Sequence, residues 1–541
     1  MANNFNEYKR NPYQEINECT ARGTCSLAPN IAVLQELAVI FLQQISHYII
    51  LLNKLGASNK SINEKIITIL ASLVSVNEFS DTQLYDIIKT EYYLLKNVKD
   101  TYHKVCKDNN IRPNRLKNPI KFDEQTKLAQ TIEFGEKYIR EKYNSFTKQE
   151  KNLFIILEMV LKSSSLNLIK SIDFKQDETE NIEQIIKTLD LFNHAKLNEK
   201  QITQEIFKIA DIDYKLQLKI CKLLTEHFGE ISETKVSHSS RKGKAILVSG
   251  NNFFDLLNLL ESTKNQNIDI YTHSNLLITH ALEKFKSYSH LIGHYGDTTE
   301  NCLIDFATFP GAILLTKNSK NNTEYFYRGR LFSTDDIVPD GVIKIKNQKY
   351  EEIIEAAKNS KGFSKGKIKE DSIIGYQPKE IDSTLYQVIT KFINKEIKNL
   401  YIIGIDAHLE LQKEYFKEFF KNLKDDEFAI SFSYTSTKEN VLSIPVGNYI
   451  PLVTNILKKV FDKILIADNR ISFFLTTCDV MTISSIITLK AYNATNLYLA
   501  KCPPTLINPS VHKTLSQTFG IKTTTNAIKD LELIRNEKST Q

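Results

Sequence analysis

Apolar residues recur at intervals of three and four along the first part of the chain, from about residue 30 to about residue 230. This spacing puts apolar side chains on one face of an α-helix. Turn-forming residues interrupt the pattern at Gly56, at Arg112-Pro113-Asn114 and at Asp211-Ile212-Asp213. The pattern predicts an all-α region with helices over residues 31–55, 64–76, 82–105, 122–143, 148–163, 181–191, 199–210 and 214–228.

A different pattern begins near residue 244, where short apolar runs alternate with stretches of helical spacing. The runs predict buried strands over residues 245–249, 268–274 and 309–316. Strands that alternate with helices form a parallel α/β sheet. Ligands of such sheets bind beyond the carboxyl ends of the strands. Those ends are Gly250-Asn251, Thr272-His273 and residues 316–319.

The last part of the chain repeats this alternation. Apolar runs predict strands over residues 399–404, 428–434, 464–467 and 496–499. Helical spacing predicts helices over residues 414–423, 451–461, 478–489 and 508–518. The expected fold class is multidomain α + α/β. It comprises an N-terminal helical bundle domain at 1–240 and two Rossmann-like parallel-sheet α/β domains at 241–375 and 376–541.

Composition is that of an ordinary globular protein, with 541 residues of which 42% are hydrophobic and 25% are charged. The net charge of +6 is small, and Lys is spread along the chain. A solvated surface is therefore a better interpretation than nucleic-acid binding. Residues 1–18 have no apolar core of a signal peptide, and the apolar stretch 31–55 carries several polar side chains. We expect a cytoplasmic protein with no membrane span.

Seven Cys are scattered through the chain, at Cys19, Cys25, Cys106, Cys221, Cys302, Cys478 and Cys502. An odd number of isolated Cys in a long cytosolic chain does not indicate a disulfide framework. Cys19 and Cys25 stand apart, because a helix is predicted to begin shortly after them, near Pro29. Backbone N–H groups at a helix start favour thiolates. The two residues are therefore either unpaired small residues or a pair of thiolates.

Five short motifs resemble one family: ILVSG at 246–250, YTHS at 271–274, HLIGHYG at 290–296, FPGAILLT at 309–316 and YRGR at 327–330. In this order and spacing they resemble the hybrid cluster proteins, also called prismane proteins or hydroxylamine reductases. Those proteins are relatives of the nickel carbon monoxide dehydrogenases. The resemblance covers most of the chain. It implies a helical domain, two α/β domains and reduction of hydroxylamine or nitric oxide at an iron–sulfur–oxygen hybrid cluster.

The resemblance also indicates what this chain lacks. The family holds its hybrid cluster with a His, two Glu and four Cys. The matching positions here are Asn251, Asn275, Ser319, Asp406, Tyr434, Tyr449 and Leu475. Iron clusters need thiolate, imidazole or carboxylate ligands, and these residues cannot replace them as a set. We therefore expect the scaffold to be kept and the hybrid cluster to be absent.

By resemblance, Cys19 and Cys25 match the second pair of a four-Cys motif that holds a cubane or related cluster. The first pair falls near Pro12 and Glu15 and is missing. Two chains could complete such a site together, as the related carbon monoxide dehydrogenases do at their dimer interface. The resemblance thus implies a homodimer that shares one 4Fe-4S cluster. A disulfide, another metal such as zinc, and free thiols are the alternatives.

The sequence leaves three functions to distinguish. The preferred one is a pseudoenzyme that keeps at most this one cluster, with a structural, electron-relay or redox-sensing role and a redox partner. The second is an active oxidoreductase with an altered metal site. The third is a metal-free scaffold or interaction protein. Side chains that could build a replacement site are His273, Cys302, Asp406, His408, Cys478 and Cys502. They come from separate motifs, so the second function is not preferred.

Overall fold

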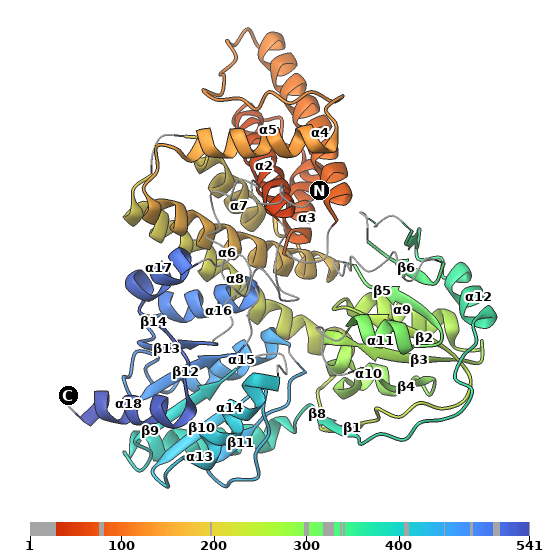
Figure 1. The fold of residues 1–541 in the computed structure, drawn as a ribbon, viewed down its shortest axis with the longest axis vertical. Coiled ribbons are helices and arrows are strands. Elements are labelled where there is room, and N and C mark those ends of the chain that lie inside the picture. The colour runs from red at the N-terminus through yellow and green to blue at the C-terminus, as the bar shows by residue number, and fades with distance from the viewer. Residues whose placement is uncertain are drawn as a thin grey trace, which may run out of the picture. The chain divides into compact units, whose positions relative to one another are not determined.

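The computed structural model falls into two compact units, Met1–Asp213 with Pro504–Leu515 and Tyr214–Pro503 with Ser516–Gln541 (Figure 1). The structure describes residues 29–74, 80–194, 197–296, 302–317, 329–335, 338, 341–404, 410–447, 449–476, 480–500 and 509–539. The three-domain boundaries expected from the sequence stay a prediction.

The helical region forms where the apolar spacing predicts it. Its helices are α2 (Pro29–Lys54), α3 (Lys60–Ser72), α4 (Asp81–Asp108), α5 (Leu128–Tyr143), α6 (Lys148–Asp173), α7 (Thr179–Leu191) and α8 (Glu199–Phe228). Side-chain caps fix several of the starts. Ser80 and Gln83 form a capping box at α4, and Thr147 and Glu150 form another at α6, so that backbone N–H groups at these ends are satisfied.

One predicted break between helices is wrong, because residues 211–213 continue α8. The Asp213 carboxylate accepts hydrogen bonds from Ser163 at 3.2 Å and from Asn167 at 2.8 Å, both on α6. Because these hydrogen bonds hold the Asp213 carboxylate against α6, Asp213 stays within α8 and does not form a turn. A second difference is that the helix predicted from residue 122 begins at Leu128.

Most side chains of α2 are buried. The helix packs against α4, α5 and α7. Its polar residue Gln44 donates to the Asn118 carbonyl at 3.1 Å and accepts from the Ile120 N–H at 2.9 Å, so this buried amide is satisfied.

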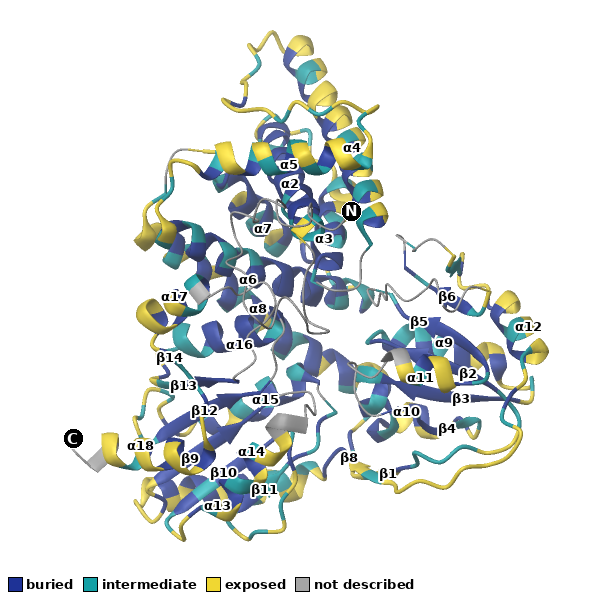
Figure 2. Cartoon of the chain, viewed as in Figure 1, coloured by how far each residue is buried: buried dark blue, intermediate teal, exposed yellow. Residues whose placement is uncertain are grey.

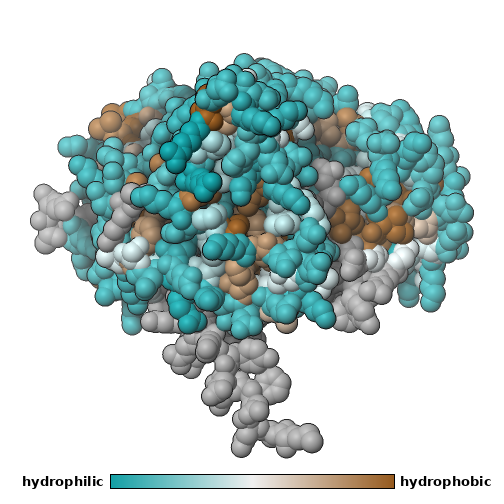
Figure 3. Space-filling view, turned by 90° about the horizontal axis from the view of Figure 1, so that it is seen from above, coloured by the Kyte–Doolittle hydropathy of each residue, from teal (hydrophilic) through white to brown (hydrophobic). Residues whose placement is uncertain are grey.

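Among the described helices, α2 and α6 are long and apolar enough to cross a membrane, yet 89% of each apolar window is buried in the fold (Figure 2). The face drawn in Figure 3 is mostly hydrophilic.

The first sheet has the strand order β4-β3-β2-β5-β6-β7, and all its pairs are parallel. Gly311, just before β5, lets this strand approach β2, since a Cβ there would lie 2.0 Å from the Ala245 carbonyl oxygen. The strands are β2 (Lys244–Ser249), β3 (Ile268–His273), β4 (Leu291–His294), β5 (Ala312–Leu315), β6 (Leu331–Ser333) and β7 (Ile343–Lys344). The helices are α9 (Phe253–Thr263), η1 (Ser274–Ala281), α10 (Glu283–Lys286), α11 (Cys302–Thr308) and α12 (Glu351–Asn359).

The second sheet has the order β11-β10-β9-β12-β13-β14 and is also parallel. Its strands are β9 (Asn399–Ile403), β10 (Glu427–Ser431), β11 (Val441–Ser443), β12 (Ile471–Leu475), β13 (Asn496–Leu499) and β14 (Ile521–Thr523). Its helices are α13 (Pro378–Ile393), α14 (Glu410–Lys421), α15 (Ile450–Phe461), α16 (Val480–Ala491), α17 (Pro509–Phe519) and α18 (Ala527–Ser539).

The strand predicted at residues 464–467 is wrong, because this segment lies in turns and β12 follows it. Leu465 is 78% exposed, whereas every residue of β12 is buried. A short antiparallel ribbon of β1 (Thr234–Val236) and β8 (Ser372–Ile374) pairs the segments on either side of the first sheet. The observed fold is an N-terminal helical region followed by two parallel α/β sheets, which confirms the expected fold class.

Candidate functional site

The loops after β2 and β5 meet at the carboxyl edge of the first sheet. The Thr316 hydroxyl accepts the backbone N–H groups of Asn251 at 3.1 Å and of Asn252 at 3.3 Å. The Asn252 side chain then caps α9 by accepting the N–H of Asp255. As predicted from the sequence, the ends of separate strands therefore come together at this edge.

His273, at the end of β3, is fixed through both ring nitrogens. Its Nδ1 lies 2.8 Å from the Ser249 hydroxyl, and its Nε2 lies 3.3 Å from an Asp305 carboxylate oxygen. Ser, His and Asp are also the residue types of nucleophilic triads. Here Ser249 and His273 are both buried. These hydrogen bonds therefore hold His273 in the core and do not present a nucleophile to a substrate.

A group of uncharged His side chains lies beside His273. The Thr272 hydroxyl is 2.8 Å from His280 Nε2 and 2.8 Å from His294 Nδ1, and the His294 ring stacks on His273. Burial, followed by the nearby His273, holds the pKa of His294 well below its usual range. Burial, together with His238, lowers the pKa of His280 to about 4. At neutral pH these rings therefore form a hydrogen-bonded packing cluster.

Five of the seven predicted ligand positions of the hybrid cluster lie in the described part of the chain. Asn251 follows β2 and Asn275 follows β3, and both are half-buried. Tyr434, Tyr449 and Leu475 are buried. None of these five side chains is a thiolate, an imidazole or a carboxylate. The donors that they offer do not fit an iron cluster of this type.

Aromatic packing occupies the surroundings of the two Tyr. The Tyr434 ring stacks on Phe416 at 4.8 Å and belongs to the core cluster that includes Phe474. The Tyr449 ring lies 5.1 Å from Phe253, at the start of α9, two residues after Asn251. Burial raises the pKa of the Tyr449 hydroxyl, so it stays protonated. Both Tyr residues therefore contribute to the core.

Several predicted site residues lie outside the described residues: Cys19, Cys25, Ser319, Asp406, His408, Cys478 and Cys502. The side chain of Cys302, the first residue of α11, is not described either. The helix predicted after Cys25 is present and begins at Pro29. Cys106 and Cys221 are free and buried, as predicted, and burial raises the pKa of the Cys221 thiol to about 11. That thiol is unreactive at neutral pH.

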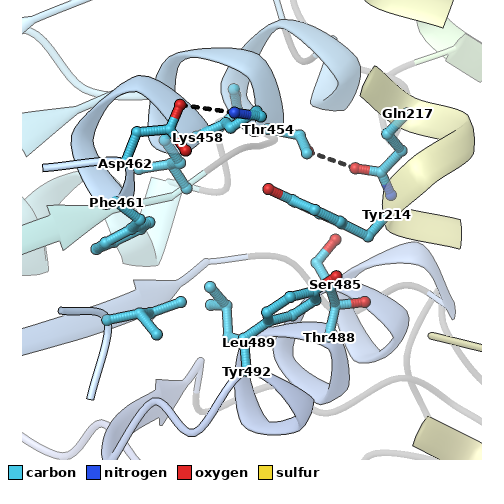
Figure 4. A pocket seen from close by; sticks show the side chains of 13 residues that line it. Tyr214, Gln217, Thr454, Lys458, Phe461, Asp462, Ser485, Thr488, Leu489 and Tyr492 are labelled. Atoms are coloured by element: carbon cyan, nitrogen blue, oxygen red, sulfur yellow. Dashed lines mark hydrogen bonds and ion pairs between the residues drawn. The ribbon is translucent and has the colours of Figure 1, made fainter. Parts of the chain in front are cut away.

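Sequence reasoning missed a cavity of about 250 Å³ between α15, α16 and the residues of α8 that follow Asp213 (Figure 4). The rings of Tyr214 and Tyr492 lie 4.9 Å apart along its wall. Four of its polar side chains are paired with one another, since Thr454 bonds Gln217 and Lys458 bonds Asp462. The helical spacing of α15 and α16 gives no sign of this cavity. The cavity has space for an apolar group, but its lining offers a ligand no unpaired charge.

Comparison with known proteins gives matches along most of the chain. Residues 15–444 match the family described as the Prismane/CO dehydrogenase family. The chain is 25% identical over 552 residues to a hydroxylamine reductase of Thermodesulfovibrio yellowstonii, covering 96% of this chain and 98% of that relative. It is 24% identical over 532 residues to a hydroxylamine reductase of Methanocella arvoryzae, covering 95% and 97%.

Among solved structures, the chain is similar to alpha subunits of acetyl-CoA synthase/carbon monoxide dehydrogenase with NiZn[Fe4S4] and NiNi[Fe4S4] clusters. The TM-score is 0.49 at 10% sequence identity, over 95% of this chain and 84% of that chain.

Proposed function

Because the chain belongs to the Prismane/CO dehydrogenase family, we propose that it is an iron–sulfur protein of the hybrid cluster type that has lost the catalytic hybrid cluster. The matched relatives named hydroxylamine reductase cover nearly the whole chain. We therefore apply the proposal to the helical region and to both sheets.

The main support is the chemistry at Tyr434. By resemblance this position belongs to a cluster-binding Cys, and here a buried ring stacks on Phe416 inside an aromatic core. Leu475 at another ligand position is buried and has no donor atom in its side chain. An iron–sulfur cluster needs space and thiolate, imidazole or carboxylate donors, and these two positions supply neither.

We propose that the protein keeps one cluster, a 4Fe-4S group shared across a homodimer through Cys19 and Cys25 of each chain. Support comes from the spacing of the two thiols and from the helix that begins at Pro29, shortly after them. With no hybrid cluster, the shared cluster would have a structural, electron-relay or redox-sensing role. The last two roles require a redox partner.

Metal analysis of the protein purified without oxygen tests the proposal. Iron, sulfide, zinc and nickel are quantified per chain and compared with the visible spectrum and the oligomeric state. We expect about two irons and two sulfides per chain, as one cubane per dimer requires. Cys19→Ser should lose both, whereas Cys106→Ser, at a buried isolated thiol, should keep them. Hydroxylamine reduction should not exceed the background rate.

Other outcomes would favour the two alternatives. Markedly more iron, or stoichiometric nickel, together with hydroxylamine reduction would indicate an active oxidoreductase with an altered metal site. A folded chain that never contains metal, even when prepared under reducing conditions, would indicate a scaffold or interaction protein.

A further inference from the structure

Three side chains with metal-binding atoms meet between α2 and the end of α7. His47 lies on α2, Asp190 lies in the last turn of α7, and His194 follows that helix. The carboxylate of Asp190 joins the two rings: one oxygen lies 3.0 Å from His47 Nδ1 and the other lies 2.9 Å from His194 Nε2. The three donor atoms lie within 4.8 Å of one another.

Two imidazoles and one carboxylate are a common ligand set for zinc and for other divalent transition metals. In a tetrahedral zinc site, with bonds of about 2.0–2.1 Å, neighbouring donor atoms are about 3.3 Å apart. Both nitrogen–oxygen separations here are already close to that value. All three donor atoms lie within 4.8 Å of one another, so a movement of the partly exposed His194 can bring them to the separations of a zinc site.

The three donor residues differ in burial: two are enclosed by the fold, and one is open to solvent. His47 and Asp190 are each only 7% exposed, whereas the side chain of His194 is 51% exposed. An ion could therefore enter from the side of His194 and keep a water molecule as a fourth ligand. Asn193 also donates to Asp190, at 3.1 Å, and so orients the carboxylate.

The orientation of His47 provides an independent observation. Its Nε2 is buried and has no hydrogen-bond partner among the residues that the structure describes. The contact of Nδ1 with Asp190 therefore sets the orientation of the ring. The Asp190 carboxylate accepts hydrogen bonds from His47, His194 and Asn193, so both of its oxygens are held toward the two rings.

We propose that His47, Asp190 and His194 bind one divalent transition-metal ion of the zinc class, which joins α2 to α7. The donors do not include Cys19 or Cys25, so the site is independent of the shared cluster. Metal-binding His residues usually donate their second N–H to a partner. His47 Nε2 has no such partner in the described part of the chain, so we expect an affinity in the micromolar range.

Titration of Co²⁺ and Zn²⁺ into the chelator-treated full chain carrying Cys19→Ser and Cys25→Ser tests this site without interference from those thiols. We expect one Co²⁺ per chain, with visible absorption typical of nitrogen and oxygen ligands and without thiolate charge-transfer bands. Zn²⁺ should displace the Co²⁺ and raise Tm, because an ion that binds only the folded state stabilises it. EDTA should reverse the change in Tm.

The decisive variant is His194→Ala, because this side chain is largely exposed and its loss should not prevent folding. It should weaken Zn²⁺ binding at least about tenfold, since one of three protein ligands is removed. His103→Ala, at a half-buried His on α4, is the matched control and should bind as the parent does. Equal Zn²⁺ affinity in parent and His194→Ala would overturn the proposal. A parent chain that binds neither ion at 100-fold excess over a micromolar Kd, roughly 0.1 mM, would also overturn it.

Discussion

Replacing Glu91 by Leu should stabilise the helical region of this protein. Glu91 lies in the middle of α4 and is 0% exposed. Neither carboxyl oxygen has a hydrogen-bond partner within the described residues. Its neighbours three and four positions away on the helix are the buried residues Ile87, Ile88, Leu94 and Leu95. Burial raises the pKa of this carboxyl well above its ordinary value of 4.5.

Two effects set the size of the gain. A buried polar group without a hydrogen bond costs about 1–3 kcal/mol, and Leu removes this cost while it adds apolar burial. We therefore expect a gain of about 2 kcal/mol near pH 5. The second effect depends on pH. Above pH 4.5 the unfolded chain loses this proton while the folded chain keeps it, so the parent loses about 1.4 kcal/mol of stability per pH unit, up to the folded-state pKa.

Two substitutions separate these effects. Glu91→Leu should raise stability at pH 5 and remove the decline at higher pH. Glu91→Gln should remove the decline but give little gain at pH 5, because the buried amide is still polar. Asp100→Asn, at an exposed position on the same helix, should change neither quantity. Since long chains do not unfold in one step, hydrogen exchange of α2 and α4 peptides from pH 5 to pH 8 is the suitable assay.

The reasoning would be refuted if Glu91→Leu opened more readily than the parent at pH 7. An unchanged pH dependence in both Glu91 variants would refute it as well. Either result would mean that the carboxyl has a charged partner in the folded protein.

Three further predictions concern two other buried groups and the half-buried Glu36. Tyr434→Ala should cost about 3–5 kcal/mol, as core aromatics do, and a near-neutral change in urea midpoint would contradict a filled core there. His273→Asn should cost about 2–3 kcal/mol through its lost bonds to Ser249 and Asp305, measured as a lower Tm at unchanged iron content. Burial and then Glu158 raise the pKa of Glu36 to about 8, so helical-region stability should fall as pH rises from 4.5 to 8, and Glu36→Gln should flatten that decline in hydrogen exchange.

Local patterns were sufficient to predict most elements. Apolar spacing located every helix from α2 to α7, because apolar side chains at helical spacing become buried in the fold, and β13 was predicted with its observed bounds. The errors arose where tertiary contacts decide. From the sequence alone Asp213 is typical of a turn, whereas its hydrogen bonds to α6 in the structure hold it within a helix. Residues 464–467 look like a strand, but the buried run beginning at Ile471 is the one that pairs with β9.

The candidate sites were harder to predict, because they depend on contacts between distant positions. Resemblance located Tyr434 and Tyr449, but only the structure gives the stacking of Tyr434 on Phe416 and the contact of the Tyr449 ring with Phe253. His47 and Asp190 are 143 positions apart, and no local pattern joins them. The only local sign was the pair Asp190 and His194, which are four positions apart at a helix end.

The packing around the ligand positions implied by the resemblance predicts that single substitutions would not build a hybrid cluster. A ligand set has to be complete before a cluster can bind, so Tyr434→Cys alone would gain no metal. It would also remove a ring that stacks on Phe416 and leave a cavity in the aromatic core, at a cost of a few kcal/mol, roughly that of other large-to-small core changes. Each step back toward the ligand set therefore lowers stability before it can restore binding. If the hybrid cluster has been lost as proposed, the side chains at these positions complete the core without it, and the scaffold can keep a different role.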